Sequence, residues 1–117
     1  MRVLVIEYEP IIRMDLAFLV GSMGHAVVGP FSDEDEAIAA IEESRPDAAL
    51  LDYILGGKTT SERCADILTG ARVPFAFVTG HQRNLLPARF ADIPVIAKPF
   101  DMTVLYGFLS QTEWQRA

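Results

Sequence analysis

The feature of this chain that most constrains its fold is a regular alternation between short apolar runs and longer amphipathic segments. Five runs rich in apolar residues, many of them β-branched or aromatic, lie at residues 3–6, 26–29, 48–51, 75–78 and 94–97. Each run has about the length of a strand, and its unbroken apolar character is typical of a strand covered on both faces. The runs therefore predict five strands.

Helical patterns separate these runs. Residues 12–23 carry apolar side chains at helical spacing, up to a closing glycine. The second helix is predicted to open with the Ser-Asp-Glu-Asp capping pattern of residues 32–35 and to stop at Pro46. A third helix is predicted over residues 61–68, closed by Gly70.

The segment after the fourth run is the least regular part of the sequence. Residues 81–92 predict only a short helix interrupted by Pro87. Asp101 is expected to cap a last helix. The inner face of that helix is predicted to consist of Val104, Leu105, Phe108 and Leu109.

Strands that alternate with helices predict an α/β fold of the doubly wound type, with a parallel sheet covered by helices on both faces. The crossovers between the strands are expected to be right-handed. A length of 117 residues fits one domain, and no repeat or linker interrupts the pattern. We therefore predict that residues 1–117 form a single domain.

Charge and cysteine content exclude several classes of function. The net charge is −6, whereas nucleic acids and anionic membranes are bound by basic faces, so neither is an expected partner. No apolar run approaches the roughly 18 residues of a membrane-spanning helix. Cys64 is the one cysteine, which excludes an internal disulfide and a cysteine-based zinc site. With no signal-peptide pattern at the N-terminus, we expect a cytoplasmic protein.

Residues able to do chemistry follow four of the five predicted strands. In a doubly wound sheet, sites form beyond the carboxyl ends of the strands. Those ends carry Glu7, Asp52, Thr79 and Lys98. Carboxylates can hold a hard cation such as Mg²⁺, and Asp52 is a candidate nucleophile that would form an acyl phosphate. A hydroxyl and an amine would then offset the charge of a phosphoryl group.

Four motifs at these strand ends resemble the motifs of response-regulator receiver domains, in order and in spacing. They are Val3-Leu4-Val5-Ile6-Glu7, Leu50-Leu51-Asp52, Val78-Thr79-Gly80 and Lys98-Pro99-Phe100. The resemblance implies a flavodoxin-like (βα)5 fold with strand order 2-1-3-4-5. It also implies two-component signal transduction rather than ordinary enzyme turnover. In that function, Asp52 accepts a phosphoryl group from a histidine kinase or a phosphotransfer protein, assisted by Thr79 and Lys98.

The resemblance carries further expectations about cofactor and partners. It implies a Mg²⁺ site formed by Glu7, Asp52 and the backbone carbonyl of Ile54. It implies output through contact with a downstream protein, and a homodimer is compatible with it. The segment Pro74-Phe75-Ala76-Phe77-Val78-Thr79-Gly80 resembles a subgroup of receivers that is common in alphaproteobacteria and often stands alone.

Two positions depart from the family pattern. Tyr8 stands where receivers carry the second acid of the metal-binding pair, and a phenol is neutral at pH 7 and a poor ligand for Mg²⁺. Val95 stands where many receivers carry an aromatic residue that moves on activation. Metal affinity is therefore in question, and residues 81–92 are the expected mobile element of any switch.

Two alternative functions stay open. The first is a pseudo-receiver, in which Tyr8 fills the acid pocket and the fold serves as an interaction module. The second is a nucleotide or flavin binder, which is disfavoured because Glu7-Tyr8-Glu9 stands where a glycine-rich turn would be needed. His81, two residues after Thr79, either gates the site or is an ordinary loop residue.

Overall fold

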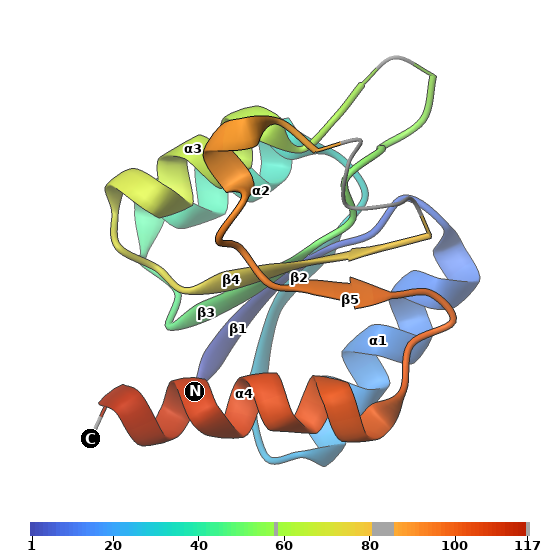
Figure 1. The fold of residues 1–117 in the computed structure, drawn as a ribbon, viewed down its shortest axis with the longest axis vertical. Coiled ribbons are helices and arrows are strands. Elements are labelled where there is room, and N and C mark those ends of the chain that lie inside the picture. The colour runs from blue at the N-terminus through green and yellow to red at the C-terminus, as the bar shows by residue number, and fades with distance from the viewer. Residues whose placement is uncertain (58, 81–85, 117) are drawn as a thin grey trace.

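The computed structural model describes residues 1–57, 59–80 and 86–116, and within these ranges five parallel strands form one sheet (Figure 1). The order of the strands is β2-β1-β3-β4-β5. This confirms the predicted doubly wound fold with the flavodoxin-like order. The strands are β1 (Arg2–Ile6), β2 (Ala26–Phe31), β3 (Ala48–Leu51), β4 (Phe75–Thr79) and β5 (Val95–Ala97).

Helices cover both faces of the sheet (Figure 1). One face carries α1 and α4, and the other carries α2 and α3. No helix among the described residues is long and apolar enough to cross a membrane. The helices are α1 (Pro10–Ser22), α2 (Glu34–Glu43), α3 (Glu62–Gly70) and α4 (Met102–Arg116).

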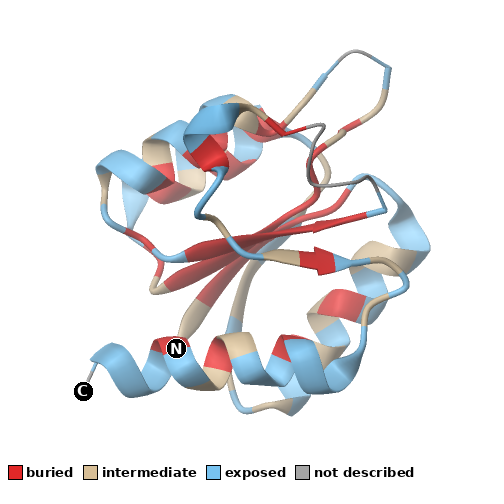
Figure 2. Ribbon diagram, viewed as in Figure 1, coloured by how far each residue is buried: buried red, intermediate tan, exposed pale blue. Residues whose placement is uncertain are grey.

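The central strands are buried on both faces, as their unbroken apolar runs predict (Figure 2). Every residue of β3 has an exposed fraction of 0%. Alternate residues of this strand face opposite layers: Ala49 and Leu51 pack towards α2 and α3, whereas Ala48 and Leu50 pack towards α1 and α4. A sheet with two apolar faces needs two helical layers, which is why the chain wraps helices around both sides.

The connection between β4 and β5 contains no α-helix in its described part. Residues 86–92 contain only the 3-10 helix Ala88–Phe90. Residues 81–85 lie outside the described ranges, so the role predicted for His81 stays a prediction. Phe90 packs edge-on against Phe77 of β4 at a centroid separation of 5.5 Å. Arg89 pairs with Asp66 of α3 at 2.9 Å. Arg89 also pairs with Glu62 of the same helix at 3.1 Å, so the connection is held to β4 by an aromatic contact and to α3 by two ion pairs.

Three local predictions differ from the structure. The cap of α2 is Asp33 and not Ser32, because the Asp33 carboxylate accepts the Glu36 N–H at 3.0 Å. Gly70 is the last residue of α3 rather than the residue that closes it. Val104 was predicted to face inwards but is 51% exposed, since Leu105 and Leu109 lie on the side of α4 that meets the sheet.

Candidate functional site

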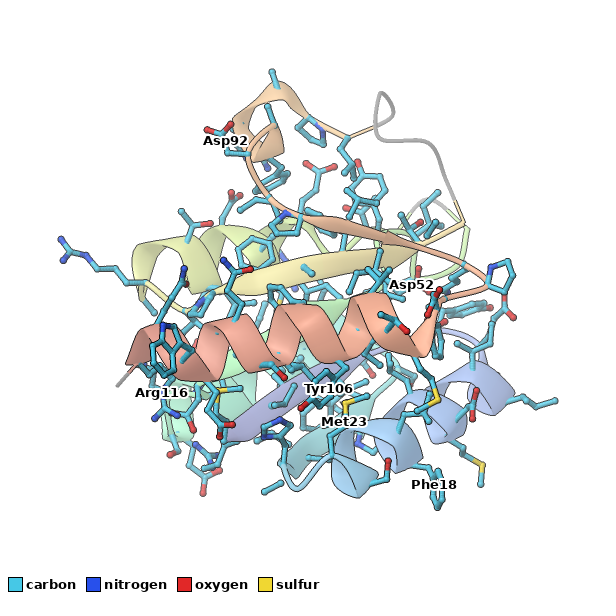
Figure 3. All side chains as sticks on the ribbon, turned by 60° about the horizontal axis from the view of Figure 1, so that its bottom comes forward. Phe18, Met23, Asp52, Asp92, Tyr106 and Arg116 are labelled. Atoms are coloured by element: carbon cyan, nitrogen blue, oxygen red, sulfur yellow. The ribbon has the colours of Figure 1, made fainter. Side chains whose placement is uncertain are left out.

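The residues predicted from the strand ends do meet at one edge of the sheet. Glu7 follows β1, Asp52 follows β3, Thr79 ends β4 and Lys98 follows β5. Because the strands are parallel and adjacent, their carboxyl ends share one edge, where Asp52 is labelled in Figure 3. The backbone N–H of Lys98 donates to the carbonyl of Thr79 at 3.0 Å, which fixes the β5 end beside the β4 end.

The centre of the site is a lysine held between two carboxylates. The ammonium Nζ of Lys98 lies 2.6 Å from Glu7 Oε1 and 3.3 Å from Asp52 Oδ2. The three side chains are 13%, 0% and 7% exposed, respectively. Removing the ammonium of Lys98 would leave two buried carboxylates without a counter-charge, and a loss of this kind typically costs about 3–5 kcal/mol. Lys98 therefore organises the edge electrostatically as well as lying next to Thr79.

The carboxyl of Glu7 is the most perturbed acid of the site. Its burial raises its pKa to about 7, and hydrogen bonding to Asp52 adds to the rise, while Lys98 and the Glu9 N–H oppose it. That N–H donates to Glu7 Oε2 at 3.1 Å. Glu7 thus changes its charge near neutral pH, and it is not the solvated acid that a strand end often carries.

Asp52 has the placement expected of a nucleophile. Asp52 as a whole residue is 5% exposed, and it lines a cavity of about 600 Å³ together with Lys98. The backbone N–H of Tyr8 donates to Asp52 Oδ2 at 3.3 Å. The Asp52 N–H donates to the carbonyl of Ile6, so the backbone at this position is held by the sheet. A rigid backbone with a carboxylate at a cavity wall is an arrangement suited to attack on a bound electrophile.

Tyr8 lies at the rim of this cavity and not in a sealed pocket. Its side chain is 51% exposed, and its ring lies over Gly56. A Cβ atom at Gly56 would meet the Tyr8 ring at 2.6 Å, and Gly56 has a φ of +95°, so a glycine is required there for two reasons. The ammonium of Lys98, rather than the phenol, spans the two buried carboxylates.

Arg13 is a site residue that the sequence did not reveal. Its guanidinium donates to the carbonyls of Glu7 at 2.9 Å and Tyr8 at 3.1 Å. These bonds hold the turn between β1 and α1, which carries the first acid of the site. The only signal in the sequence is that Arg13 lies one turn into a helix that begins at Pro10, and such a position predicts nothing about backbone carbonyls.

The donor atoms at this edge fit a weakly held Mg²⁺ ion. Among the described residues, no group of three or more His, Cys, Asp or Glu side chains is placed so that it could hold a metal ion. Two carboxylates are present, from Glu7 and Asp52, and Ile54 lines the same cavity as Asp52. Protein sites for Mg²⁺ often use one or two carboxylates and keep several waters. These donor types suit Mg²⁺, but the set has one acid fewer than the family pattern, because Tyr8 stands at the position of the second acid.

The fold, the strand order and this constellation define a class: the chain belongs to the response-regulator receiver domains. No family model matches the sequence. Among curated proteins, it is 37% identical over 113 residues to the phyllosphere-induced regulator PhyR of Methylorubrum extorquens, covering 94% of this chain and 42% of that protein. The curated relatives are thus about twice as long as this chain.

Solved structures give the same result over nearly the whole of both chains. SdrG from Sphingomonas melonis Fr1 has 33% sequence identity and a TM-score of 0.82, covering 95% of this chain and 94% of that chain. The receiver domain of the response regulator PhyR from Erythrobacter litoralis has 29% identity and a TM-score of 0.83, covering 97% and 89%. These likenesses confirm the resemblance on which the predicted fold and signalling class were based.

Proposed function

We propose that Asp52 accepts a phosphoryl group from a histidine kinase or a phosphotransfer protein. The observation that carries this proposal is the contact of one lysine with two buried carboxylates at the carboxyl edge of the sheet. The Lys98 ammonium lies 3.3 Å from Asp52 and 2.6 Å from Glu7, beside the end of β4 that carries Thr79. Membership of the receiver family supports the same role.

The transfer step follows from the charges of the site. A carboxylate oxygen of Asp52 forms the new P–O bond, while the P–N bond to the donor's histidine breaks. The electron pair of that bond stays on the ring nitrogen, which takes up a proton. Lys98 offsets the negative charge of the phosphoryl oxygens, and the Thr79 hydroxyl donates a hydrogen bond to one of them. Phosphoryl transfer needs chiefly this positioning and charge neutralisation.

Mg²⁺ would be held by Glu7, Asp52 and the backbone carbonyl of Ile54. When bound, the ion neutralises charge on the phosphoryl oxygens. Lys98 already neutralises part of the negative charge at this edge, because it contacts both carboxylates. We therefore expect the ion to bind more weakly than at a site with three acids.

An exposed apolar stripe beside the site provides a surface for the donor protein. Ile11, Met14 and Phe18 lie on one side of α1 and are 83%, 72% and 72% exposed. Phe18 points outwards from this helix in Figure 3. Because α1 begins at Pro10, close to Glu7, a protein docked on the stripe would have its reactive group near the cavity. Clustered exposed apolar side chains of this kind mark interaction surfaces.

The test is intact-mass spectrometry after incubation with a phosphorylated donor or with acetyl phosphate, with and without Mg²⁺. We expect a gain of about 80 Da, the mass of one added phosphoryl group, that is absent in Asp52→Asn. Phe18→Ser should slow transfer from the protein donor and leave transfer from acetyl phosphate unchanged. Mass gain in the Asp52→Asn variant would place the acceptor elsewhere.

A second candidate is a pseudo-receiver that acts as an interaction module without phosphorylation. The observation that favours it is Tyr8, which replaces an acid and lies over Gly56 at the cavity rim. Absence of labelling in the folded wild type, with labelling restored by Tyr8→Asp, would support this candidate. Ready Mg²⁺-dependent labelling of the wild type at Asp52 would exclude it.

A further inference from the structure

A groove opens at the edge of the sheet opposite to Asp52. It lies at the amino ends of two strands, since Pro74 directly precedes β4 and Pro94 directly precedes β5. Its volume is about 500 Å³. β4 is five residues long, so with a rise of about 3.3 Å per residue the groove is more than 10 Å from the phosphoryl-acceptor edge.

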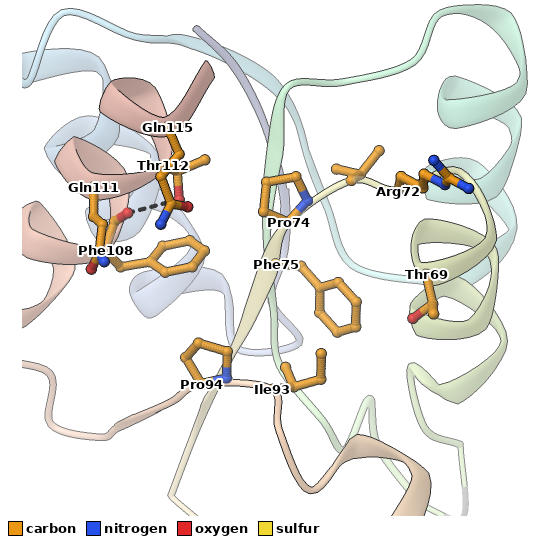
Figure 4. A pocket seen from close by; sticks show the side chains of 11 residues that line it. Thr69, Arg72, Pro74, Phe75, Ile93, Pro94, Phe108, Gln111, Thr112 and Gln115 are labelled. Carbon is orange, nitrogen blue, oxygen red and sulfur yellow. Dashed lines mark hydrogen bonds between the residues drawn. The ribbon is translucent and has the colours of Figure 1, made fainter. Parts of the chain in front are cut away.

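The groove lies at a corner of the sheet that no described α-helix covers. α3 covers one face of the sheet and α4 covers the other, while the described part of the β4–β5 connection has only a 3-10 helix. The outer corner of the sheet between the end of α3 and the flank of α4 is therefore left open. Figure 4 shows this corner, with residues of α4 on one side and residues of α3 and β4 on the other.

The interior of the groove is apolar. Phe75 forms part of its wall and is only 3% exposed. Ile93 and Phe108 line it from the β4–β5 connection and from α4, and both are partly buried against the two cores. Typical small-molecule sites have volumes of about 300–1,000 Å³, apolar walls and a few polar groups that fix the orientation of the ligand.

The polar groups at the rim carry a positive charge. Arg72 is the one charged residue among the described residues that line the groove, and Gln111 and Gln115 add amides from α4. No described residue forms an ion pair with the Arg72 guanidinium. In a chain with a net charge of −6, a groove whose described lining residues carry a single charge, the cation of Arg72, favours an anionic ligand.

The backbone around Arg72 is held in an unusual conformation. Arg72 has a φ of 59°, which is uncommon for a residue other than glycine and is found where the surroundings enforce it. Here Arg72 closes the end of α3, where the N–H of Val73 donates to the carbonyl of Leu68 at 2.9 Å. The guanidinium of Arg45 donates to the carbonyl of Arg72 at 2.7 Å and to that of Ala71 at 2.9 Å. Arg45 thus satisfies the end of α3 and leaves the side chain of Arg72 available to a ligand.

We propose that this groove binds a small amphipathic anion, namely an aryl or alkyl carboxylate. The apolar body of the ligand lies against Phe75, Ile93 and Phe108, and its carboxylate pairs with Arg72. This site does not depend on phosphorylation at Asp52, which lies at the other end of the strands.

The test is an NMR titration of the ¹⁵N-labelled protein with 4-phenylbutyrate and, separately, with its neutral analogue 4-phenylbutanamide. We expect saturable shifts for the amides of Phe75, Ile93 and Thr112, with tighter binding of the carboxylate. Arg72→Gln should weaken binding of the carboxylate about threefold, the size of one exposed ion pair, and leave binding of the amide unchanged.

The variant is matched to the wild type in its backbone, since arginine and glutamine are equally strained at a φ of 59°. Arg63→Gln, on α3 and outside the groove, serves as the control and should bind the carboxylate as the wild type does. Four outcomes would each overturn the proposal. They are equal affinity for both probes, no effect of Arg72→Gln, shifts that do not saturate, and shifts centred on the exposed stripe of α1.

Discussion

Replacing Glu7 by glutamine should stabilise this protein at alkaline pH and have little effect at acidic pH. Burial raises the pKa of Glu7 to about 7, above the ordinary value of 4.5 that applies in the unfolded chain. The folded state therefore binds a proton at Glu7 more tightly than the unfolded state does. The contribution of Glu7 to stability is therefore fully present below pH 4.5 and is lost as the pH rises through about 7.

The magnitude follows from the difference between the two pKa values. A difference of about 2.5 pH units corresponds to about 3 kcal/mol at pH 8, which we take as an upper bound because Glu7 is coupled to Asp52 and Lys98. Glutamine has nearly the shape of the protonated acid and no charge at any pH. Glu7→Gln should then recover most of this energy at pH 8, or roughly 10 °C in Tm, and less than about 1 kcal/mol at pH 5.

The assay is urea denaturation at pH 5 and pH 8 in the presence of EDTA, so that no metal ion contributes. Glu9→Gln is the matched control, because Glu9 is the exposed neighbouring acid and its replacement should shift the midpoint little at either pH. The reasoning is refuted if Glu7→Gln destabilises the protein at pH 8, or if its effect is the same at the two pH values.

Three further predictions concern the rest of the molecule. Burial raises the pKa of Cys64 to about 12, so its thiol should resist iodoacetamide at pH 8 in the native state and react within minutes in guanidinium; native labelling would contradict this. Leu109→Ala should lower the free energy of unfolding by about 2–5 kcal/mol because Leu109 is fully buried. Val104→Ala, at an exposed position of the same helix, should lower it by less than about 0.5 kcal/mol, and urea titration measures both. Arg89→Ala should cost about 0.5–1 kcal/mol through loss of the exposed pairs with Asp66 and Glu62, and high salt should reduce the difference from the wild type without removing the part due to the contact of Arg89 with the Phe90 ring.

The position of the site was predictable because it depends on topology. A parallel sheet brings all carboxyl ends to one edge, so Glu7, Asp52, Thr79 and Lys98 could be assigned to one site from their places after apolar runs. The places of these residues along the chain put them at this edge however their side chains pack. The assignment of roles to these residues stays a prediction until the labelling experiments are made.

The direction of side chains at the site was less predictable. The sequence assigned Glu7 to the site but gave no measure of its burial: Glu7 is completely buried, whereas Glu9, two residues later, is exposed. The position of the Tyr8 ring over Gly56 depends on a glycine that is 48 residues further along the chain and on its positive φ. Arg13 was missed for the same reason, since its partners are backbone carbonyls.

By itself, the sequence determined the fold class, the number and order of strands and the edge at which the candidate site lies. The fold class and the number of strands follow from the period of apolar residues, and the edge follows from the residues that end each run, which are local patterns. The order of the strands followed from the resemblance to receiver domains. The tertiary structure alone decided the ion pairs of Lys98, the raised pKa of Glu7, the exposed stripe on α1 and the groove beside Arg72. Each of these depends on which segments distant in sequence meet in space, because burial and electrostatic pairing are properties of neighbours and not of composition.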